Sequence, residues 1–314
     1  MEQSRFIEAR EFLARTLPVT RLVRAHSFEK NSEQEIYLKL ETELPTGSFK
    51  VRGALYALQA NLRRRGISKV VASSTGNHGS AVAYAAKLLG VKARIFLPEK
   101  ANPVKKANIA RLGAEIVERG AIDLAAAFEA AAEYARKSGA FFLNDADDPD
   151  LPAGPGTIAC EILEDVPEVE TIYAPMGDTA LVRGVAEAAK QISPKVKIVG
   201  VQSERAPSYA LSWNAGHAVG TETCDTIADG LATRTPLAAN VEAIRRLVDE
   251  VVLVSELEML DAMHRLASDE HVIAEPAGAA ATAAFLKSAA IGPTVLLVTG
   301  ANVDPEVFRG AVRV

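Results

Sequence analysis

One lysine stands among residues that suit covalent chemistry. Residues 44–53 read LPTGSFKVRG and place Lys50 near the start of a predicted helix, whose cap we expect to be Thr46 or Ser48. Lys50 has apolar neighbours on both sides, and a lysine in an apolar setting loses its charge more readily and can form a Schiff base. The ordinary alternative for a single lysine is a solvated side chain, so this segment needs support from the rest of the chain.

Three loops have the residue types of anion-binding turns. Residues 73–79 read SSTGNHG, residues 175–180 read PMGDTA, and residues 299–304 read TGANVD. Each follows a predicted strand, and the first two lead into a helix, where backbone N–H groups can bind a carboxylate or phosphate. Thr299 could point its hydroxyl into a cleft. Taken singly, each loop also fits ordinary capping and turn geometry.

The elements that must position these loops alternate along the chain. Ala-rich helical stretches separate short β-rich runs, which predicts parallel sheets covered by helices. The predicted strands span residues 36–40, 69–73, 93–98, 140–143, 171–174, 197–202, 250–254 and 294–299. One helix is expected from Asn77 or Ser80 to Gly90, and another from Asp123 to Gly139. Ligands of such sheets lie beyond the carboxyl ends of the strands, where the three loops occur.

Composition narrows the class of protein. The chain has 314 residues, a net charge of -5 and 48% hydrophobic residues, which allows one extended domain or two modest ones. Basic residues are spread along it, so nucleic acid is not an expected partner, and no apolar run reaches the roughly 18 residues that span a bilayer. Cys160 and Cys224 are expected to be free thiols in a reducing cytoplasm, and the first residues do not resemble a secretory signal.

Six motifs in order carry a family resemblance. They are PTGSFKVRGA around Lys50, SSTGNHGSAVAYAA from Ser73, GPGTI at 154–158, TIADGLA from Thr226, EPAGAA from Glu275 and TGANVD from Thr299. Together they resemble the fold-type II pyridoxal-phosphate enzymes, and within them the threonine and serine dehydratases and serine racemases. The resemblance spans nearly the whole chain.

The resemblance implies a fold and a division of the chain. We expect an α/β fold like that of the tryptophan synthase β subunit, with two three-layer α/β/α domains and mostly parallel sheets. Residues 1–45 and 146–314 would form a large cofactor-binding domain. Residues 46–145 would form a small inserted domain that carries the substrate-carboxylate loop. The active site would lie in the cleft between them, and a homodimer is expected by analogy.

It also implies roles for single residues. Lys50 would carry pyridoxal 5'-phosphate as a Schiff base and move protons at the α-carbon, and Thr75 matches the second acid/base of the racemases. The substrate carboxylate would be bound by Ser74, Thr75, Gly76, Asn77 and His78. The other cofactor-binding residues would be Phe49, Asn77, Met176, Gly177, Asp178, Thr179, Ala180, Gly230, Glu275 and Thr299. Gly230 could instead be only a turn residue, and Glu275 only a buried hydrogen-bonded group.

The main departure from the family lies in the phosphate loop. A run of four glycines is usual, whereas this chain has a carboxylate, Asp178, where a phosphate dianion should bind. We expect Asp178 to turn outward as a helix cap while backbone N–H groups and Thr179 bind the phosphate. An inward Asp178 would weaken cofactor binding. Thr299 matches the neutral partner of the ring nitrogen, which suits elimination better than transamination.

These features predict an ammonia-lyase that converts a small hydroxy amino acid, such as L-threonine or L-serine, to a 2-oxo acid and ammonium. Thr75 is bulkier than the serine of the racemases, which disfavours racemisation. The racemase metal site pairs a Glu with an Asp six residues later, but Glu204 is matched with Ala210, so no strong magnesium or calcium site is expected. The chain ends soon after Thr299, which favours a catabolic or specialised role. The alternatives are a racemase or β-replacement synthase, and a non-catalytic cofactor- or metabolite-binding protein.

Overall fold

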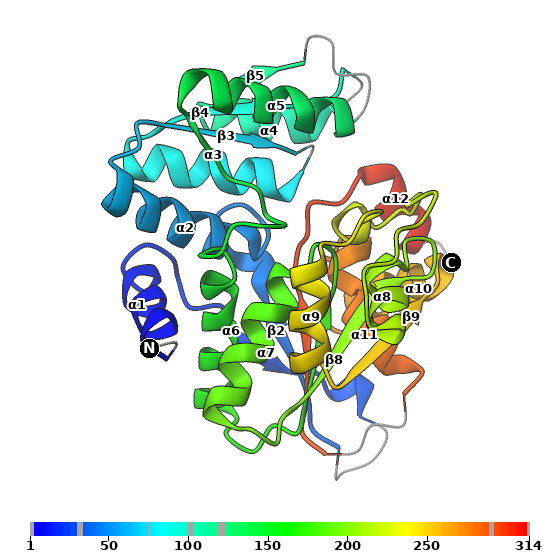
Figure 1. Ribbon diagram of the computed structural model, residues 1–314. Coiled ribbons are helices and arrows are strands. Elements are labelled where there is room, and N and C mark those ends of the chain that lie inside the picture. Colours follow the sequence, from blue (N-terminus) through cyan, green and yellow to red (C-terminus); the bar gives the residue numbers. More distant parts are fainter. Residues whose placement is uncertain are drawn as a thin grey trace.

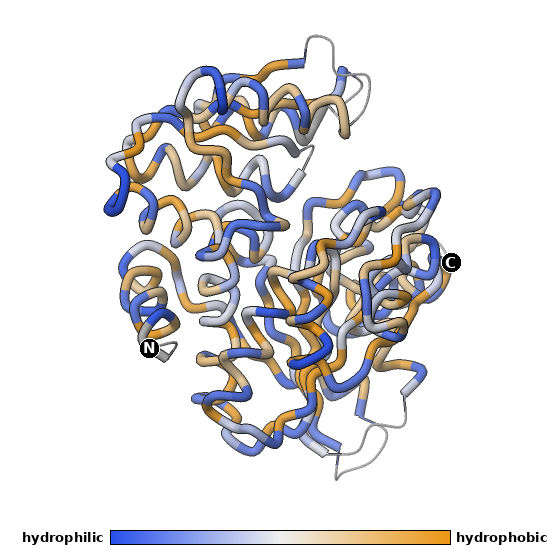
Figure 2. The backbone as a smooth tube through the Cα atoms, in the orientation of Figure 1, coloured by the Kyte–Doolittle hydropathy of each residue, from blue (hydrophilic) through white to orange (hydrophobic). Residues whose placement is uncertain are grey.

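Figure 1 shows the computed structural model, which describes residues 3–29, 34–74, 76–99, 103–118, 124–288 and 292–312. Its strands form a six-stranded and a four-stranded sheet, both flanked by helices. Figure 2 shows hydrophobic positions concentrated along the strands and the inner faces of the helices. The predicted α/β fold class is confirmed.

The six-stranded sheet has the order β1-β2-β10-β7-β8-β9. Its strands are β1 (Leu22–Arg24), β2 (Ile36–Leu40), β7 (Thr171–Pro175), β8 (Lys197–Ser203), β9 (Glu250–Val254) and β10 (Thr294–Val298). All neighbours are parallel except the edge pair β1 and β2. The register places Leu296 of β10 between Leu38 and Tyr173.

Helices cover both faces of this sheet because its strands are apolar on both sides. Val295 and Leu297 of β10 join one core, and Leu296 and Val298 join the other. The first core includes α1 (Gln3–Leu13), α6 (Ala153–Asp165), α7 (Ala180–Ile192) and α9 (Ala238–Leu247). The second includes α10 (Glu256–Ser268), α11 (Pro276–Leu286) and α12 (Pro305–Val312), while α8 (Ser208–Ala215) packs on α9. Among the helices of the described residues, none has the length and apolarity needed to cross a membrane.

The four-stranded sheet is entirely parallel, with the order β5-β4-β3-β6. Its strands are β3 (Lys69–Ser73), β4 (Lys92–Phe96), β5 (Glu115–Val117) and β6 (Phe141–Phe142). One core joins it to α2 (Lys50–Arg65), α3 (Asn77–Leu89) and Ile109 of α4 (Pro103–Arg111). A smaller core joins Val71 and Phe96 to α5 (Leu124–Ser138). The predicted domain limits at residues 45/46 and 145/146 stay a prediction.

Several predicted boundaries need correction. Neither Thr46 nor Ser48 caps α2, because the residue before the helix is Phe49 and Ser48 pairs with Gly300 in a β-bridge. The strand predicted at 140–143 has only two residues, and the strands at Leu22–Arg24 and Glu115–Val117 were not predicted. The helix start at Asn77 is confirmed, whereas Asp123 lies outside the described residues.

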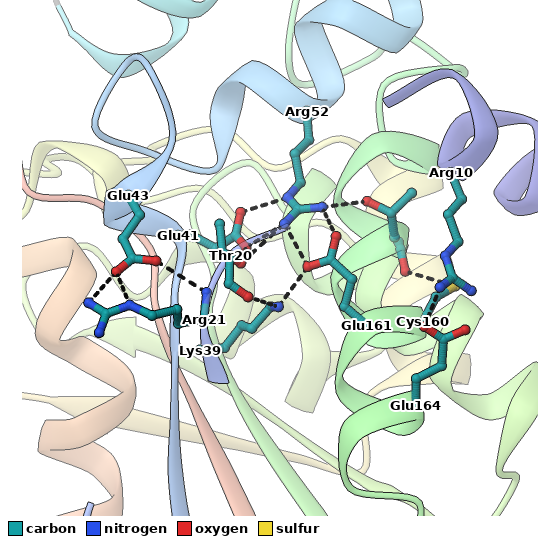
Figure 3. Close-up of polar contacts among 12 residues, drawn as sticks. Arg10, Thr20, Arg21, Lys39, Glu41, Glu43, Arg52, Cys160, Glu161 and Glu164 are labelled. Atoms are coloured by element: carbon teal, nitrogen blue, oxygen red, sulfur yellow. Dashed lines mark hydrogen bonds and ion pairs between the residues drawn. The ribbon is translucent and has the colours of Figure 1, made fainter. Parts of the chain in front are cut away.

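A buried charge cluster fixes the start of α2, as Figure 3 shows. Nε of Arg52 donates to Glu41 at 2.8 Å, Nη1 donates to Glu161 at 2.5 Å, and Nη2 donates to both carboxylates at 2.9 Å. The Nζ of Lys39 contacts Glu161 at 2.6 Å and donates to the carbonyl of Thr20 at 2.7 Å. Two cations and two carboxylates therefore satisfy one another beside the first turn of the helix.

Candidate active site

A cavity of about 440 Å³ opens where the carboxyl ends of strands from both sheets meet. Its wall comes from the first residues of α2, α3, α7 and α11 and from the segments after β3, β7 and β10. This is where parallel sheets place ligands. Nearly all of the predicted site residues that the structure describes lie on it, namely Phe49, Lys50, Ser74, Gly76, Asn77, His78, Gly177, Asp178, Thr179, Ala180, Gly230, Glu275 and Thr299.

Lys50 is the first residue of α2 and faces the cavity. Its Nζ forms an ion pair with the carboxylate of Asp145 and lies 5.6 Å from the centre of the Phe49 ring. Burial opposes the charge, but the carboxylates of Asp145, Asp178 and Glu275 outweigh it and hold the pKa of Lys50 above its usual value. The expectation that apolar neighbours favour a neutral amine is therefore wrong for Lys50 in this setting.

Asp145 is a cavity residue that the sequence did not single out. It follows β6, and its carboxylate contacts Lys50 and lies 3.8 Å from Nδ1 of His78. Burial alone would raise the pKa of Asp145, but Lys50 and His78 hold it well below its usual value. Asp145 is the last residue of the predicted small domain and belongs to none of the six motifs, so no role was assigned to it.

His78 is buried beside this ion pair. Its Nε2–H donates to the carbonyl of Leu143 at 2.9 Å, which leaves Nδ1 facing Asp145. Burial lowers the pKa of His78 and outweighs the opposing charge of Asp145, and the nearby Lys50 lowers the pKa further. The imidazole can therefore accept a hydrogen bond through Nδ1 inside the cavity.

Asp178 points into the cavity, which contradicts the prediction that it turns outward. The hydroxyl of Thr233 donates to its Oδ1 at 3.1 Å. The residue at the cap position of α7 is Thr179, and no side chain makes a capping bond there. Burial first, and the charge of Asp145 second, raise the pKa of Asp178 to about 6. Thr233, which lies 55 residues away in sequence, thus holds the carboxyl inward.

The turn that carries Asp178 has an unusual backbone. Thr179 has a φ of 68°, in the left-handed region where glycine is favoured, and Nε of Arg183 donates to its hydroxyl at 3.0 Å. A Cβ on Gly177 would overlap the carbonyl oxygen of Gly230, so this glycine allows the turn to pack directly on η3 (Asp229–Leu231). The side chain of Met176 is buried in the core and does not line the cavity.

The opposite wall is held by a chain of amide and carboxylate groups. Nδ2 of Asn302 donates to Asn77 at 2.7 Å, and Nδ2 of Asn77 donates to Glu275 at 2.5 Å. Thr299 is 4% exposed and lines the cavity beside them. Asn302 was not predicted, although it lies in the TGANVD motif. Thr75, predicted as a catalytic and substrate-binding residue, lies outside the described residues.

The chemistry open to this cavity follows from its groups. It offers a primary amine at Lys50, backbone N–H groups at the starts of α3 and α7, and a neutral hydroxyl at Thr299. An aldehyde could condense with the amine, and anions could bind at either helix start. Ser73 also lines the cavity, and its Oγ is buried with no hydrogen-bond partner among the residues that the structure covers.

Comparison with known proteins supplies independent findings. Residues 14–300 match the family model described as pyridoxal-phosphate dependent enzyme. The chain is 39% identical over 302 residues to an L-threonine ammonia-lyase of Thermotoga maritima, covering 95% of this chain and 74% of the relative. It is 35% identical over 303 residues to the catabolic L-threonine dehydratase of Escherichia coli, and the match covers 95% of this chain and 92% of the relative. The structure of maize serine racemase superposes with a TM-score of 0.90 at 30% identity, covering 99% and 96%.

Proposed function

This chain belongs to the family of pyridoxal-phosphate dependent enzymes, and we propose that it is an ammonia-lyase that converts a small hydroxy amino acid, such as L-threonine or L-serine, to a 2-oxo acid and ammonium. The membership confirms the resemblance inferred from the motifs and gives pyridoxal phosphate as the cofactor. The relatives that are named L-threonine ammonia-lyase and catabolic L-threonine dehydratase support this reaction. The observation that carries the proposal is the amine of Lys50, which faces the cavity.

The residues around the cavity fit this cofactor. The volume of the cavity, about 440 Å³, is typical of small-molecule sites. Lys50 would hold the cofactor through its amine, and the backbone of residues 177–180 at the start of α7 would hold the phosphate. We assign contacts with the ring to Phe49, Asn77, Gly230, Glu275 and Thr299. When bound, the cofactor supplies an aldehyde that condenses with amines and a ring that accepts electrons from the carbon beside the amine.

The start of α3 is proposed to bind the carboxylate of the substrate. Ser74, Gly76, Asn77 and His78 line the cavity there, and the free N–H groups of a helix start attract a negative charge. Thr75 belongs to the same loop, and we propose it as a second group at the α-carbon. This binding would orient the α-hydrogen of the substrate relative to Lys50.

Lys50 is proposed to move a proton at the α-carbon. Asp145 contacts its Nζ and would stabilise the ammonium form that Lys50 adopts after it takes the proton. Thr299 offers the ring nitrogen a neutral hydroxyl, so the ring would stabilise negative charge at the α-carbon less than it would with a charged partner. That suits elimination, in which the β-hydroxyl leaves as the α-proton is removed.

Assembly and location are also part of the proposal. A homodimer rests on analogy with the family alone. A cytoplasmic location is supported by Cys160 and Cys224, which are both free thiols, because thiols persist in a reducing compartment.

A substrate screen tests the reaction. The wild-type enzyme should release 2-oxo acid and ammonium from L-threonine or L-serine, and Lys50→Ala should lower kcat by about a thousandfold or more, since it removes the reacting amine. Lys87→Ala is the matched control, because Lys87 is exposed in the last turn of α3. It should change the rate little. A cofactor-loaded enzyme that releases no ammonium from any hydroxy amino acid would refute the proposal, and chiral analysis of recovered substrate would reveal a racemase.

A further inference from the structure

Asp178 brings a negative charge to the turn that the proposed function assigns to the phosphate. Its carboxyl lines the cavity at the amino end of α7, a helix of 13 residues, and accepts a hydrogen bond from Thr233. The side chain of Thr233 comes from the segment after η3, on the other side of the turn. Asp178 is therefore fixed toward the place where the N–H groups of the helix start would hold an anion.

The charged and titratable groups around Asp178 do not neutralise it. Asp145 from the segment after β6 repels its charge, whereas Lys50 from α2 and Arg183 from α7 attract it. The phenol of Tyr209 from α8 also lies within electrostatic range. Lys50 is paired with Asp145, and Arg183 donates to Thr179 and to the carbonyl of Ala146. Within the described part of the chain, no cation forms an ion pair with Asp178.

A phosphate at this turn would place two anions side by side in a buried site. Such a pair cannot stay fully ionised, and one proton between the two oxygens turns repulsion into a strong hydrogen bond. We propose that Asp178 and the cofactor's phosphate share one proton, so that the protein takes up a proton from solvent when pyridoxal phosphate binds. The inference rests on the proposed placement of the phosphate. The raised pKa of Asp178, about 6, agrees with it.

The proton balance gives a clear pH dependence. Above pH 7 the free phosphate is a dianion, since its second pKa is near 6, and Asp178 is also ionised, so binding must draw one proton from the buffer. Affinity for pyridoxal phosphate should then fall by up to about tenfold per pH unit between pH 7 and pH 9. Pyridoxal reacts with the same lysine but has no phosphate, so the ratio of the two affinities removes the titration of Lys50.

Equilibrium titration followed by visible absorbance measures this ratio for the wild type and for Asp178→Asn. Asp147→Asn is the control, because Asp147 is exposed and does not line the cavity. The ratio should fall with pH in the wild type and in Asp147→Asn. It should be flat in Asp178→Asn, because the amide already supplies the donor. A ratio that is flat in the wild type, or falls equally in Asp178→Asn, would overturn the shared proton.

Calorimetry in two buffers of different ionisation heat counts the proton directly. At pH 8 the wild type should take up about one proton more with pyridoxal phosphate than with pyridoxal, and equal counts would refute the proposal. This comparison needs no variant, so it decides the matter even if Asp178→Asn folds poorly. Absence of ammonium release would refute the proposed function without changing the proton count, so the two failures can be told apart.

Discussion

Lys50 and Arg52 lie two residues apart on α2, and each meets carboxylates in a different way. Arg52 and Lys39 face Glu41 and Glu161, and every nitrogen of the guanidinium has a partner. Among the described residues, Lys50 has one ion-pair partner, Asp145, while further carboxylates line the same cavity. The cluster around Arg52 has equal numbers of cations and carboxylates and is buried. The cluster around Lys50 has more carboxylates than cations and faces a cavity that a ligand can enter. Charge balance thus separates a structural cluster from a reactive one on the same helix.

Breaking the closed cluster should have the largest effect on stability. Arg52→Met leaves Glu41 and Glu161 with too few partners in a buried site, which should lower the free energy of unfolding by about 3 to 5 kcal/mol. Urea unfolding measures the loss. Arg63→Met on the same helix is the control, because the pair of Arg63 with Glu8 is exposed and should contribute less than about 1 kcal/mol. Equal losses for both variants would refute the distinction.

Removing the carboxylate of Asp178, which has no ion-pair partner among the described residues, should instead stabilise the protein at neutral pH. Folding raises the pKa of Asp178 to about 6 from a usual value near 3.8. The contribution of this carboxyl to the free energy of unfolding is therefore fully present below pH 4 and is lost as the pH rises through 6. Asp178→Asn should therefore raise the free energy of unfolding of the cofactor-free protein by about 2 to 3 kcal/mol at pH 7.5, with little change at pH 4. Destabilisation at pH 7.5 would contradict the prediction, and unfolding curves at both pH values provide the measurement.

Removing the carboxylate of Asp145, the ion-pair partner of Lys50, should give the smallest effect, and this effect is on the rate of reaction with the cofactor. Asp145→Asn removes a carboxylate that holds the pKa of Lys50 above its usual value, so more of the amine is neutral at pH 7. Condensation with pyridoxal phosphate should become severalfold faster at pH 7, because the neutral amine is the form that reacts. Stopped-flow absorbance follows the reaction. A rate that is unchanged or slower would show that Asp145 does not control the amine.

In the six-stranded sheet, the sequence predicted every strand of five or more residues closely. The runs at 171–174 and 294–299 are nearly all apolar and match β7 and β10 closely. β1 was missed because it is a three-residue edge strand that contains an arginine, too short for a pattern to emerge. Local periodicity therefore predicts strands that are long enough to show a pattern, including the edge strand β9, and misses those of three residues.

The candidate site was predicted through motifs, and two of its errors have causes in the tertiary structure. Asp145 meets Lys50 across 95 residues, and nothing in the local sequence indicates that its carboxylate points to an amine. Local capping statistics favoured an outward Asp178, but the hydrogen bond from Thr233 decides the direction. Partners that are distant in sequence thus determine which way a loop side chain points, and this information is absent from the loop itself.

The Arg52 cluster also limits how the two sheets can move relative to each other. It joins the first turn of α2 to Glu41 and Glu161, which belong to segments packed on the six-stranded sheet, whereas most of α2 packs on the four-stranded one. Any movement between the sheets that keeps this cluster intact would keep Arg52 beside the six-stranded sheet. Lys50, two residues before Arg52, would then stay with that sheet as well.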